Sequence, residues 1–393
     1  MILGGRTLFN NTRMEIVLDA GRVQSCREFG ISDTGGTPDT NSTNDTNIWI
    51  APALIDIQVN GFAGFDLNVD AVTAGDVSAM LGALWRVGTG FVCPTVVTGS
   101  FTGIRNTLRA IVAACEADRL VDHAVLGIHL EGPYISDADG PRGAHPLAHV
   151  RDPAWDEFQR WQEAADGRIT LVTLAPERTG ALRFIEQLVA AGITVALGHT
   201  AASSETIHAA IAAGARLSTH LGNGAHAHLP RHPNYIWEQL GADALWASFI
   251  VDGHHLPSPV AKSMLRAKTP QRSLLVSDAV ALAGMPPGTY HFAGRAVELT
   301  ADRCVRLVGT EYLAGSAIEL ARGVENCVRF AGLSLREAVA LATVQPMHLL
   351  NAQKRVETHT NLIRFTWDAA RAELHLLATI IGDELVYHAE AER

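Results

Sequence analysis

Beyond about residue 48 the hydrophobic positions form short continuous runs, and longer amphipathic segments lie between many of them. Short apolar runs followed by helical patterns are typical of parallel strands buried on both faces. The runs predict eight strands, at Ile50–Val59, Phe91–Thr98, Val125–Leu130, Ile169–Leu174, Ile193–Leu197, Arg216–Thr219, Leu245–Val251 and Ser273–Val276. Helices are expected at Asp76–Val87, Gly103–Asp118, Thr179–Ala191, Ser203–Ala213, Ser258–Ala267 and Ser334–Thr343.

Eight strand–helix units favour an α/β fold of the closed (β/α)8 TIM barrel type over an open, doubly wound sheet. The alternative is an open sheet in which the strands are miscounted. A glycine-rich dinucleotide-binding motif follows none of the predicted strands, and this argues further against the open sheet.

Both ends of the chain have alternating, strand-like sequence, and neither end could bury a core alone. We therefore expect residues 1–48 and 355–393 to form one small β-sandwich domain, and residues 49–354 to form the barrel. The polar stretch at residues 32–47 is predicted to be an exposed loop.

Charge and cysteine content narrow the class of protein. The chain of 393 residues carries a formal net charge of −10, which argues against a nucleic-acid partner, although a local basic pocket for one phosphate is compatible with it. Its five cysteines are scattered without a CxxC pair, so we expect a reducing cytoplasm and no disulfide framework. Without a signal-peptide pattern or a run of 18 apolar residues, no membrane association is predicted.

Acidic and imidazole side chains follow several of the predicted strands. In such a barrel the reactive groups project from the carboxyl ends of the strands. A single histidine there is usually structural and a single aspartate usually caps a turn. Here, however, these residue types recur on one rim, where they supply ligands for a metal such as zinc. The residues concerned are Glu131, His199, His220, His255 and Asp278.

These residue types suggest a division of labour. Glu131, His199 and His220 are the best metal ligands, and three protein ligands leave a position open for water. A bound metal lowers the pKa of that water from ~15.7 towards roughly 7. Asp278 would accept the water's proton and deliver it to the leaving amine, and a nearby histidine would help the metal to polarise the carbonyl. The pattern predicts amide or ester hydrolysis, and no GxSxG motif suggests a covalent nucleophile.

Seven motifs resemble, in order, those of the N-acetylglucosamine-6-phosphate deacetylase family of the amidohydrolase superfamily. They are PALIDIQVNG (52–61), HLEGPYIS (129–136), LGHTAAS (197–203), THLGNGA (219–225), VDGHHL (251–256), LVSDAV (275–280) and LAGSA (313–317). The resemblance implies hydrolysis of the N-acetyl amide of an amino-sugar phosphate, with release of acetate. It also implies the same metal ligands, Asp278 as acid and base, and a homodimer, while the types of ligand favour zinc as the metal.

The resemblance further implies roles for single residues. Many superfamily members begin the barrel with an HxH pair that holds a second metal, but this chain has Gln58 and Asn60 there. Because amides bind divalent ions weakly, one metal ion per chain is predicted. His145 is implied to contact the acetyl group and to have a catalytic role. The phosphate is implied to contact Asn223, the Gly224 backbone and Arg231, the last from a neighbouring subunit. His255 is implied to hold a sugar hydroxyl, and the Leu313–Ala314 backbone to line the sugar.

The chain departs from the family pattern at residues 222–234 (GNGAHAHLPRHPN). A GREPG-like stretch is expected there, whereas His226, His228 and His232 surround Arg231. These histidines either supplement a phosphate site or are exposed loop residues. The departure leaves open a related substrate, such as N-acetylgalactosamine-6-phosphate or another acylated amine. A non-catalytic barrel is the other alternative, but such a chain should have lost at least one of the three metal ligands or Asp278.

Overall fold

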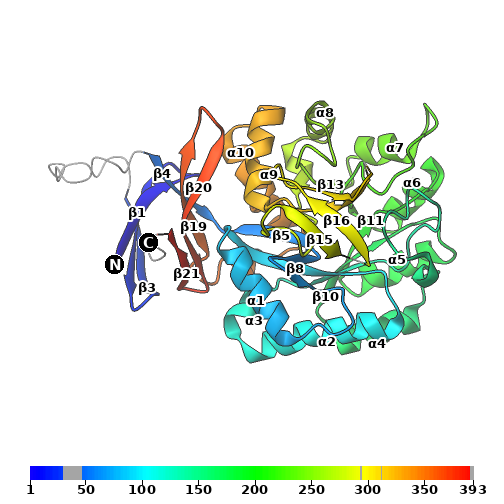
Figure 1. Ribbon diagram of the computed structural model, residues 1–393, viewed down its shortest axis with the longest axis horizontal. Coiled ribbons are helices and arrows are strands. Elements are labelled where there is room, and N and C mark those ends of the chain that lie inside the picture. Colours follow the sequence, from blue (N-terminus) through cyan, green and yellow to red (C-terminus); the bar gives the residue numbers. More distant parts are fainter. Residues whose placement is uncertain (30–46, 293, 311, 390–393) are drawn as a thin grey trace.

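The computed structural model describes residues 1–29, 47–292, 294–310 and 312–389. A large barrel domain and a smaller β-rich domain lie next to each other, and the first and the last strand of the described chain both belong to the β-rich domain (Figure 1). Eight parallel strands form the barrel in the order β14-β13-β12-β11-β10-β9-β8-β5. This arrangement confirms the predicted TIM barrel fold.

The first predicted strand, Ile50–Val59, also covers part of β4 (Ile48–Pro52), which belongs to the β-rich domain; otherwise each of the eight predicted strands corresponds to one barrel strand. Their observed bounds are β5 (Leu54–Val59), β8 (Thr89–Val97), β9 (Ile128–Glu131), β10 (Ile169–Leu174), β11 (Thr194–Leu197), β12 (Leu217–Ser218), β13 (Trp246–Phe249) and β14 (Ser273–Leu275). The helices are α1 (Ala74–Trp85), α2 (Phe101–Ala117), α3 (Arg119–Ala124), α4 (Trp155–Ala164), α5 (Ala181–Ala190), α6 (Ser204–Ala212), α7 (Tyr235–Gly241), α8 (Ser258–Lys268), α9 (Leu320–Asn326), α10 (Leu335–Leu341), α11 (Val344–Leu349) and α12 (Gln353–Val356).

The barrel closes where the first strand, β5, meets the residues that follow the last strand, β14. The backbone N–H of Asp278 donates to the Gln58 carbonyl at 2.9 Å, and that of Asn60 donates to the Ala279 carbonyl at 2.9 Å. The buried carboxylate of Asp56 also accepts from the Ser277 N–H at 3.2 Å. We call the carboxyl ends of the barrel strands the mouth. Closure therefore brings Gln58, Asn60 and Asp278 to the same side of the mouth.

The β-rich domain combines strands from both ends of the chain: β1 (Ile2–Thr7), β2 (Arg13–Asp19), β3 (Arg22–Phe29), β4 (Ile48–Pro52), β19 (Leu362–Asp368), β20 (Glu373–Ile381) and β21 (Glu384–His388). These strands form one sheet that closes on itself, because β1 pairs with β4. In place of two separate packed sheets, the domain thus has a single closed sheet around its own small core, which includes Leu3, Ile16 and Ile380. The polar stretch at residues 32–47 lies, except for Asn47, outside the described residues.

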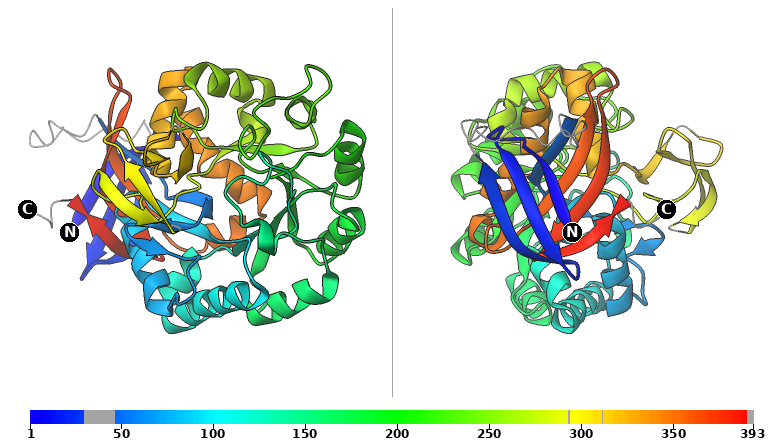
Figure 2. Two further views of the ribbon diagram at one scale, coloured as in Figure 1. Left: turned by 45° about the vertical axis from the view of Figure 1, so that its right-hand side comes forward. Right: turned by 90° about the vertical axis from the view of Figure 1, so that its left-hand side faces the viewer.

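A second sheet near the mouth was not predicted from the sequence. It contains the antiparallel strands β15 (Gly288–Phe292), β16 (Arg295–Leu299), β17 (Cys304–Leu307) and β18 (Leu313–Ser316). A bridge between Ala279 and Ser316 joins β18 to the chain after β14. Figure 2 shows this sheet, in yellow, standing out from the barrel in the right-hand view. Few of its positions are buried, so its hydrophobic pattern is weak.

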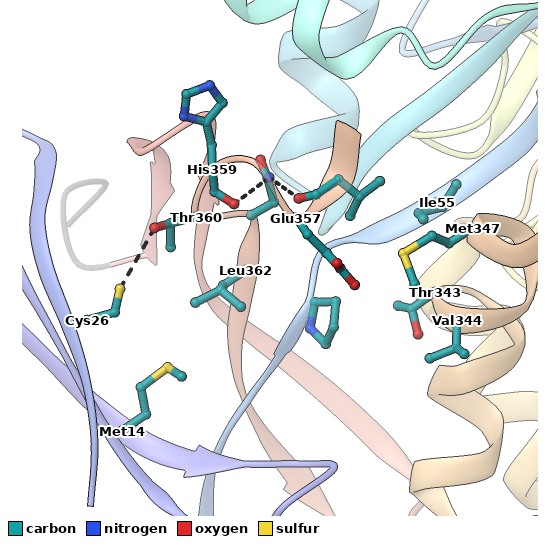
Figure 3. Close-up of a pocket in the computed structure, with 13 residues that line it drawn as sticks. Met14, Cys26, Ile55, Thr343, Val344, Met347, Glu357, His359, Thr360 and Leu362 are labelled. Atoms are coloured by element: carbon teal, nitrogen blue, oxygen red, sulfur yellow. Dashed lines mark hydrogen bonds between the residues drawn. The ribbon is translucent and has the colours of Figure 1, made fainter. Parts of the chain in front are cut away.

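A pocket of about 330 Å³ separates part of the β-rich domain from the amino-terminal end of the barrel. Met14 and Cys26 face it from one side and Ile55 and Met347 from the other (Figure 3). All five cysteines are free thiols. Among the described residues, the helices are too short or too polar to cross a membrane.

Candidate active site

Three side chains from different strands meet at the mouth of the barrel. Glu131 is the last residue of β9, and His199 and His220 each follow their strand by two residues. The Nε2 atoms of His199 and His220 lie 3.2 and 3.0 Å from Glu131 Oε1, and 3.1 Å from each other. All three side chains are buried. Elsewhere in the described parts of the chain, no other group of three such side chains is arranged to hold a metal ion.

The hydrogen bonding of His199 indicates what this cluster can bind. Its Nδ1 lies 2.8 Å from the Pro141 carbonyl oxygen. Because a carbonyl only accepts, Nδ1 carries a proton, and in the neutral form of the ring the Nε2 lone pair faces Glu131 and His220. A lone pair that faces a carboxylate oxygen in a buried site is stabilised by a cation between them. One carboxylate and two imidazoles form a donor set that suits zinc or a similar divalent ion.

Two amide side chains fix the carboxylates of the site. Gln58 Nε2 donates to Glu131 Oε1 at 2.9 Å, and Asn60 Nδ2 donates to Asp278 Oδ1 at 2.7 Å. These are the positions at which an HxH pair would be expected from the superfamily pattern. Hydrogen bonds to the groups that hold a metal or move a proton orient them for that task. Gln58 and Asn60 therefore act here as hydrogen-bond donors to acidic groups.

The backbone at the mouth is strained at three of the candidate residues. The φ angles of His199, His220 and Asp278 are +49°, +28° and +49°, in the left-handed region that non-glycine residues seldom adopt. Each such residue costs on the order of 1–3 kcal/mol, and such residues cluster at functional sites. Gly224, with φ of +56°, lies so close that an added Cβ would be 2.7 Å from His199 Nδ1. The loop after β12 can therefore pack against His199 only because position 224 is glycine.

The protonation of Asp278 and His145 suits proton transfer at this site. Burial, together with the charge of Glu131, raises the pKa of Asp278 to about 6. A cation at the cluster would lower this pKa again. Burial and the neighbouring His199 lower the pKa of His145 to about 3, so its ring is neutral near pH 7. His145 Nε2 lies 3.3 Å from His199 Nε2, and its Nδ1 lies 2.8 Å from Thr98 Oγ1.

The candidate substrate residues are less closely grouped. Asn223 and His255 are half-buried; the Asn223 amide donates to the His220 carbonyl at 3.3 Å, and His255 Nδ1 lies 2.6 Å from Asp252 Oδ2. Leu313 and Ala314 begin the half-buried strand β18 of the accessory sheet. Arg231 is exposed and, among the described residues, makes no ion pair. The structure thus gathers Glu131, His199, His220, His145, Asp278 and Gly224, and leaves Arg231 on the surface.

Three positioning groups were missed in the sequence. They are Thr98, which contacts His145, the Pro141 carbonyl, which sets the protonation of His199, and Asp252, which contacts His255. Thr98 ends a predicted strand and Asp252 follows one. Both could therefore have been identified from the sequence as polar side chains at strand ends. A backbone carbonyl such as that of Pro141 leaves no residue-type signal.

Comparison with known proteins agrees with this geometry. Residues 49–360 match the model of the amidohydrolase family, and the chain belongs to this family. It is therefore a hydrolase whose barrel carries a candidate metal cluster at its mouth.

The similar proteins point to one branch of that family. The chain is 34% identical to an N-acetylgalactosamine-6-phosphate deacetylase of Escherichia coli O157:H7, over 77% of this chain and 78% of the relative. It is 34% identical to an N-acetylglucosamine-6-phosphate deacetylase of Vibrio furnissii, over 78% and 75%. A structure of N-acetyl-D-glucosamine-6-phosphate deacetylase from Mycobacterium smegmatis matches with a TM-score of 0.81 and 26% identity, over 98% of this chain and 99% of that chain. These matches confirm the resemblance to the N-acetylglucosamine-6-phosphate deacetylase family.

Proposed function

We propose that this chain hydrolyses the N-acetyl amide of N-acetylglucosamine-6-phosphate, giving glucosamine-6-phosphate and acetate. The observation that carries the proposal is the buried cluster of Glu131, His199 and His220 beside Asp278 at the barrel mouth. The names of the relatives support the substrate class. The five unpaired cysteines support a cytoplasmic location.

The metal requirement follows from the donor set. Glu131, His199 and His220 would hold one divalent ion, for which zinc is our proposal because imidazole and carboxylate ligands suit it. When bound, this ion supplies the Lewis acidity that makes water nucleophilic near neutral pH and polarises a carbonyl. Gln58 and Asn60, both engaged as donors, support a single metal ion.

The chain's own residues then move the protons. Asp278, with its raised pKa, accepts the proton of the attacking water through the oxygen that is not bonded to Asn60. It returns that proton to the nitrogen of the leaving amine as the C–N bond breaks. His145 is neutral and donates a hydrogen bond to the acetyl oxygen, while Thr98 fixes its ring.

The sugar phosphate is bound by the loops of the mouth. Asn223 and the backbone of Gly224 contact the phosphate, His255 holds a sugar hydroxyl, and the backbone of Leu313 and Ala314 lines the sugar. Arg231, exposed and without an ion pair in the described structure, completes the phosphate site of a second copy of the chain. This role requires a homodimer. Mixing an Asp278→Asn subunit with an Arg231→Ala subunit should restore activity, because one of the two sites in the mixed dimer is then intact.

The deciding experiment compares acetate release from N-acetylglucosamine-6-phosphate, N-acetylgalactosamine-6-phosphate and the two unphosphorylated sugars. Loss of a charge-assisted contact to phosphate costs about 1.5–3 kcal/mol, so kcat/KM should fall about 10- to 100-fold or more without the phosphate. Equal rates with and without phosphate would contradict the proposed phosphate site. Removal of metal by a chelator should abolish turnover, and added Zn²⁺ should restore it.

The galactosamine epimer is the second candidate substrate, because the relative from Escherichia coli O157:H7 acts on it by name. The altered loop at residues 222–234 lies beside His199 through Gly224, so it belongs to the same mouth. A higher kcat/KM for N-acetylgalactosamine-6-phosphate in the same assay would select this alternative.

A further inference from the structure

An open pocket of about 410 Å³ lies at the amino-terminal end of the barrel strands, opposite the mouth. Helix α3, the residue before β10, helix α12 and the segment that leads to β19 all contribute to it. Its lining residues are Arg119, Asp122, His123, Arg168, Arg355 and His359. The set contains three guanidinium groups, two imidazoles and a single carboxylate. This basic pocket takes no part in the chemistry proposed for the mouth.

The arginines of the basic pocket share too few carboxylates. Arg168 and Arg355 both pair with Asp122, at 2.7 and 3.9 Å. Arg119 pairs with Glu384 of the β-rich domain, and Glu384 also lies 3.8 Å from Arg22. With Asp383, which pairs with His359, four arginines therefore face three carboxylates, a formal surplus of one positive charge. In a chain of net charge −10 such a surplus is a local exception.

The two histidines add hydrogen-bonding capacity to this surplus. His123 Nε2 lies 3.0 Å from Asn361 Oδ1, and His359 Nδ1 lies 2.7 Å from Asp383 Oδ2. The two rings meet edge to face, with centroids 5.2 Å apart. Figure 3 shows the His359 ring turned away from the apolar side chains of the neighbouring pocket. His123 Nδ1 and His359 Nε2 take no part in these two contacts and can bind another partner.

The pocket also connects the two domains. The turn between β20 and β21 packs on α3, since a Cβ at Gly382 would lie 2.9 Å from the Leu120 side chain. Asp383 and Glu384, which pair with His359 and Arg119, belong to that turn and the start of β21. A group bound here would therefore contact the barrel and the β-rich domain at once.

We infer that the basic pocket binds a small anion that carries phosphoryl groups. Arginine guanidinium groups match phosphate oxygens in a bidentate geometry and remain charged at every working pH. The pocket is large enough for a phosphate monoester. The three arginine side chains are 24–52% exposed, so an anion can reach them from solvent.

Calorimetric titration of the metal-loaded protein with glycerol 2-phosphate tests this inference, with glutarate as a dicarboxylate of the same charge. We expect one phosphate-monoester site per chain outside the mouth, and weaker binding of glutarate. The variant Arg119→Gln/Arg355→Gln should weaken binding of glycerol 2-phosphate at least tenfold. If the double variant does not fold, Arg119→Gln alone is measured instead. It changes a half-exposed side chain and should weaken the binding of glycerol 2-phosphate about threefold or more.

Two further variants serve as controls. Arg266→Gln removes the same charge from an exposed position on α8 and should leave the affinity within twofold. Arg231→Ala, at the proposed phosphate site of the mouth, should also leave the affinity for glycerol 2-phosphate unchanged. Turnover of the acetylated substrate should persist in Arg119→Gln/Arg355→Gln. The inference is overturned if glycerol 2-phosphate binding disappears in Arg231→Ala, survives in the folded Arg119→Gln/Arg355→Gln protein, or is absent from the wild type.

Discussion

The two ends of the barrel carry opposite kinds of polar cluster. At the mouth, Glu131 is buried and Asp278 half-buried beside imidazoles, and the backbone of Asp278 is left-handed. At the amino-terminal end, arginines pair with partly exposed carboxylates such as Asp122. The difference separates acidic groups withdrawn from solvent, to which we assign the chemistry, from solvent-exposed ion pairs at the joint between the domains.

The largest expected effect is the removal of a carboxylate at the mouth. Glu131→Gln keeps the shape of the side chain but removes the charge that faces His199 and His220, so we expect the metal to be lost and kcat/KM to fall by several orders of magnitude. Metal per chain by mass spectrometry and turnover of the acetylated substrate check this. The matched variant Asp122→Asn removes a carboxylate from the other end, and it should leave metal content and turnover unchanged. Full metal content in Glu131→Gln would contradict the assignment of metal binding to the mouth.

The next largest effect separates proton transfer from metal binding within the mouth. Asp278→Asn should lower kcat by about 10²- to 10⁴-fold, because the general base and acid is lost, while the metal content stays near that of the wild type. Steady-state kinetics and metal analysis on the same preparation give both readings. Substantial turnover in Asp278→Asn would mean that another group moves the proton.

The pH dependence of activity should report the same carboxylate. In the proposed mechanism Asp278 acts as a base only when ionised, and its pKa is raised to about 6 by burial and by Glu131. As pH falls through that pKa, Asp278 becomes protonated and kcat/KM should fall about tenfold for each further pH unit. Because a bound cation lowers the pKa, the acidic limb should lie at or below pH 6. A limb above pH 7 would have to be assigned to a different group.

Much of the mouth could be predicted from the sequence, because its residue types follow strands that are almost fully buried in the barrel. The strands before Glu131, His199 and His220 were identified from continuous hydrophobic runs, and the carboxyl ends of such strands meet at one place in a barrel. The accessory sheet β15–β18 could not be predicted in this way, since strands such as β15 and β16 are largely exposed and lack a continuous hydrophobic run. Its residues Leu313 and Ala314 were identified only through the family resemblance.

The basic pocket shows a different limit of sequence reasoning. Arg119, Arg168 and Arg355 are far apart in the chain, and each stands in a segment where a lone arginine is usually a solvated side chain. Only the closure of the barrel and the docking of the β20–β21 turn bring them together with His359. The hydrophobic pattern specifies that docking only indirectly, through the burial of both domains' cores.

The finest test uses two glycines with the same backbone geometry at opposite ends. Gly224 at the mouth and Gly382 at the domain joint have φ of +56° and +57°, and an added Cβ at each would lie within 3 Å of a neighbour. Gly224→Ala would press on His199, and displacement of a metal-binding group by part of an ångström should lower kcat/KM by roughly 10- to 100-fold. Gly382→Ala would press on Leu120 instead, so turnover should be kept while the free energy of unfolding falls by about 1–3 kcal/mol.

Measuring both quantities for both variants makes the pair decisive. The two positions have nearly the same φ, so the backbone cost of a left-handed alanine is similar at both and a shared loss of stability cancels in the comparison. What differs is the group that the new methyl meets: Nδ1 of His199, whose proton is held by the Pro141 carbonyl, or the flexible side chain of Leu120. If Gly382→Ala lowered kcat/KM as much as Gly224→Ala while both proteins stayed folded, the joint between the domains would be coupled to the mouth, and the two ends could no longer be treated as separate.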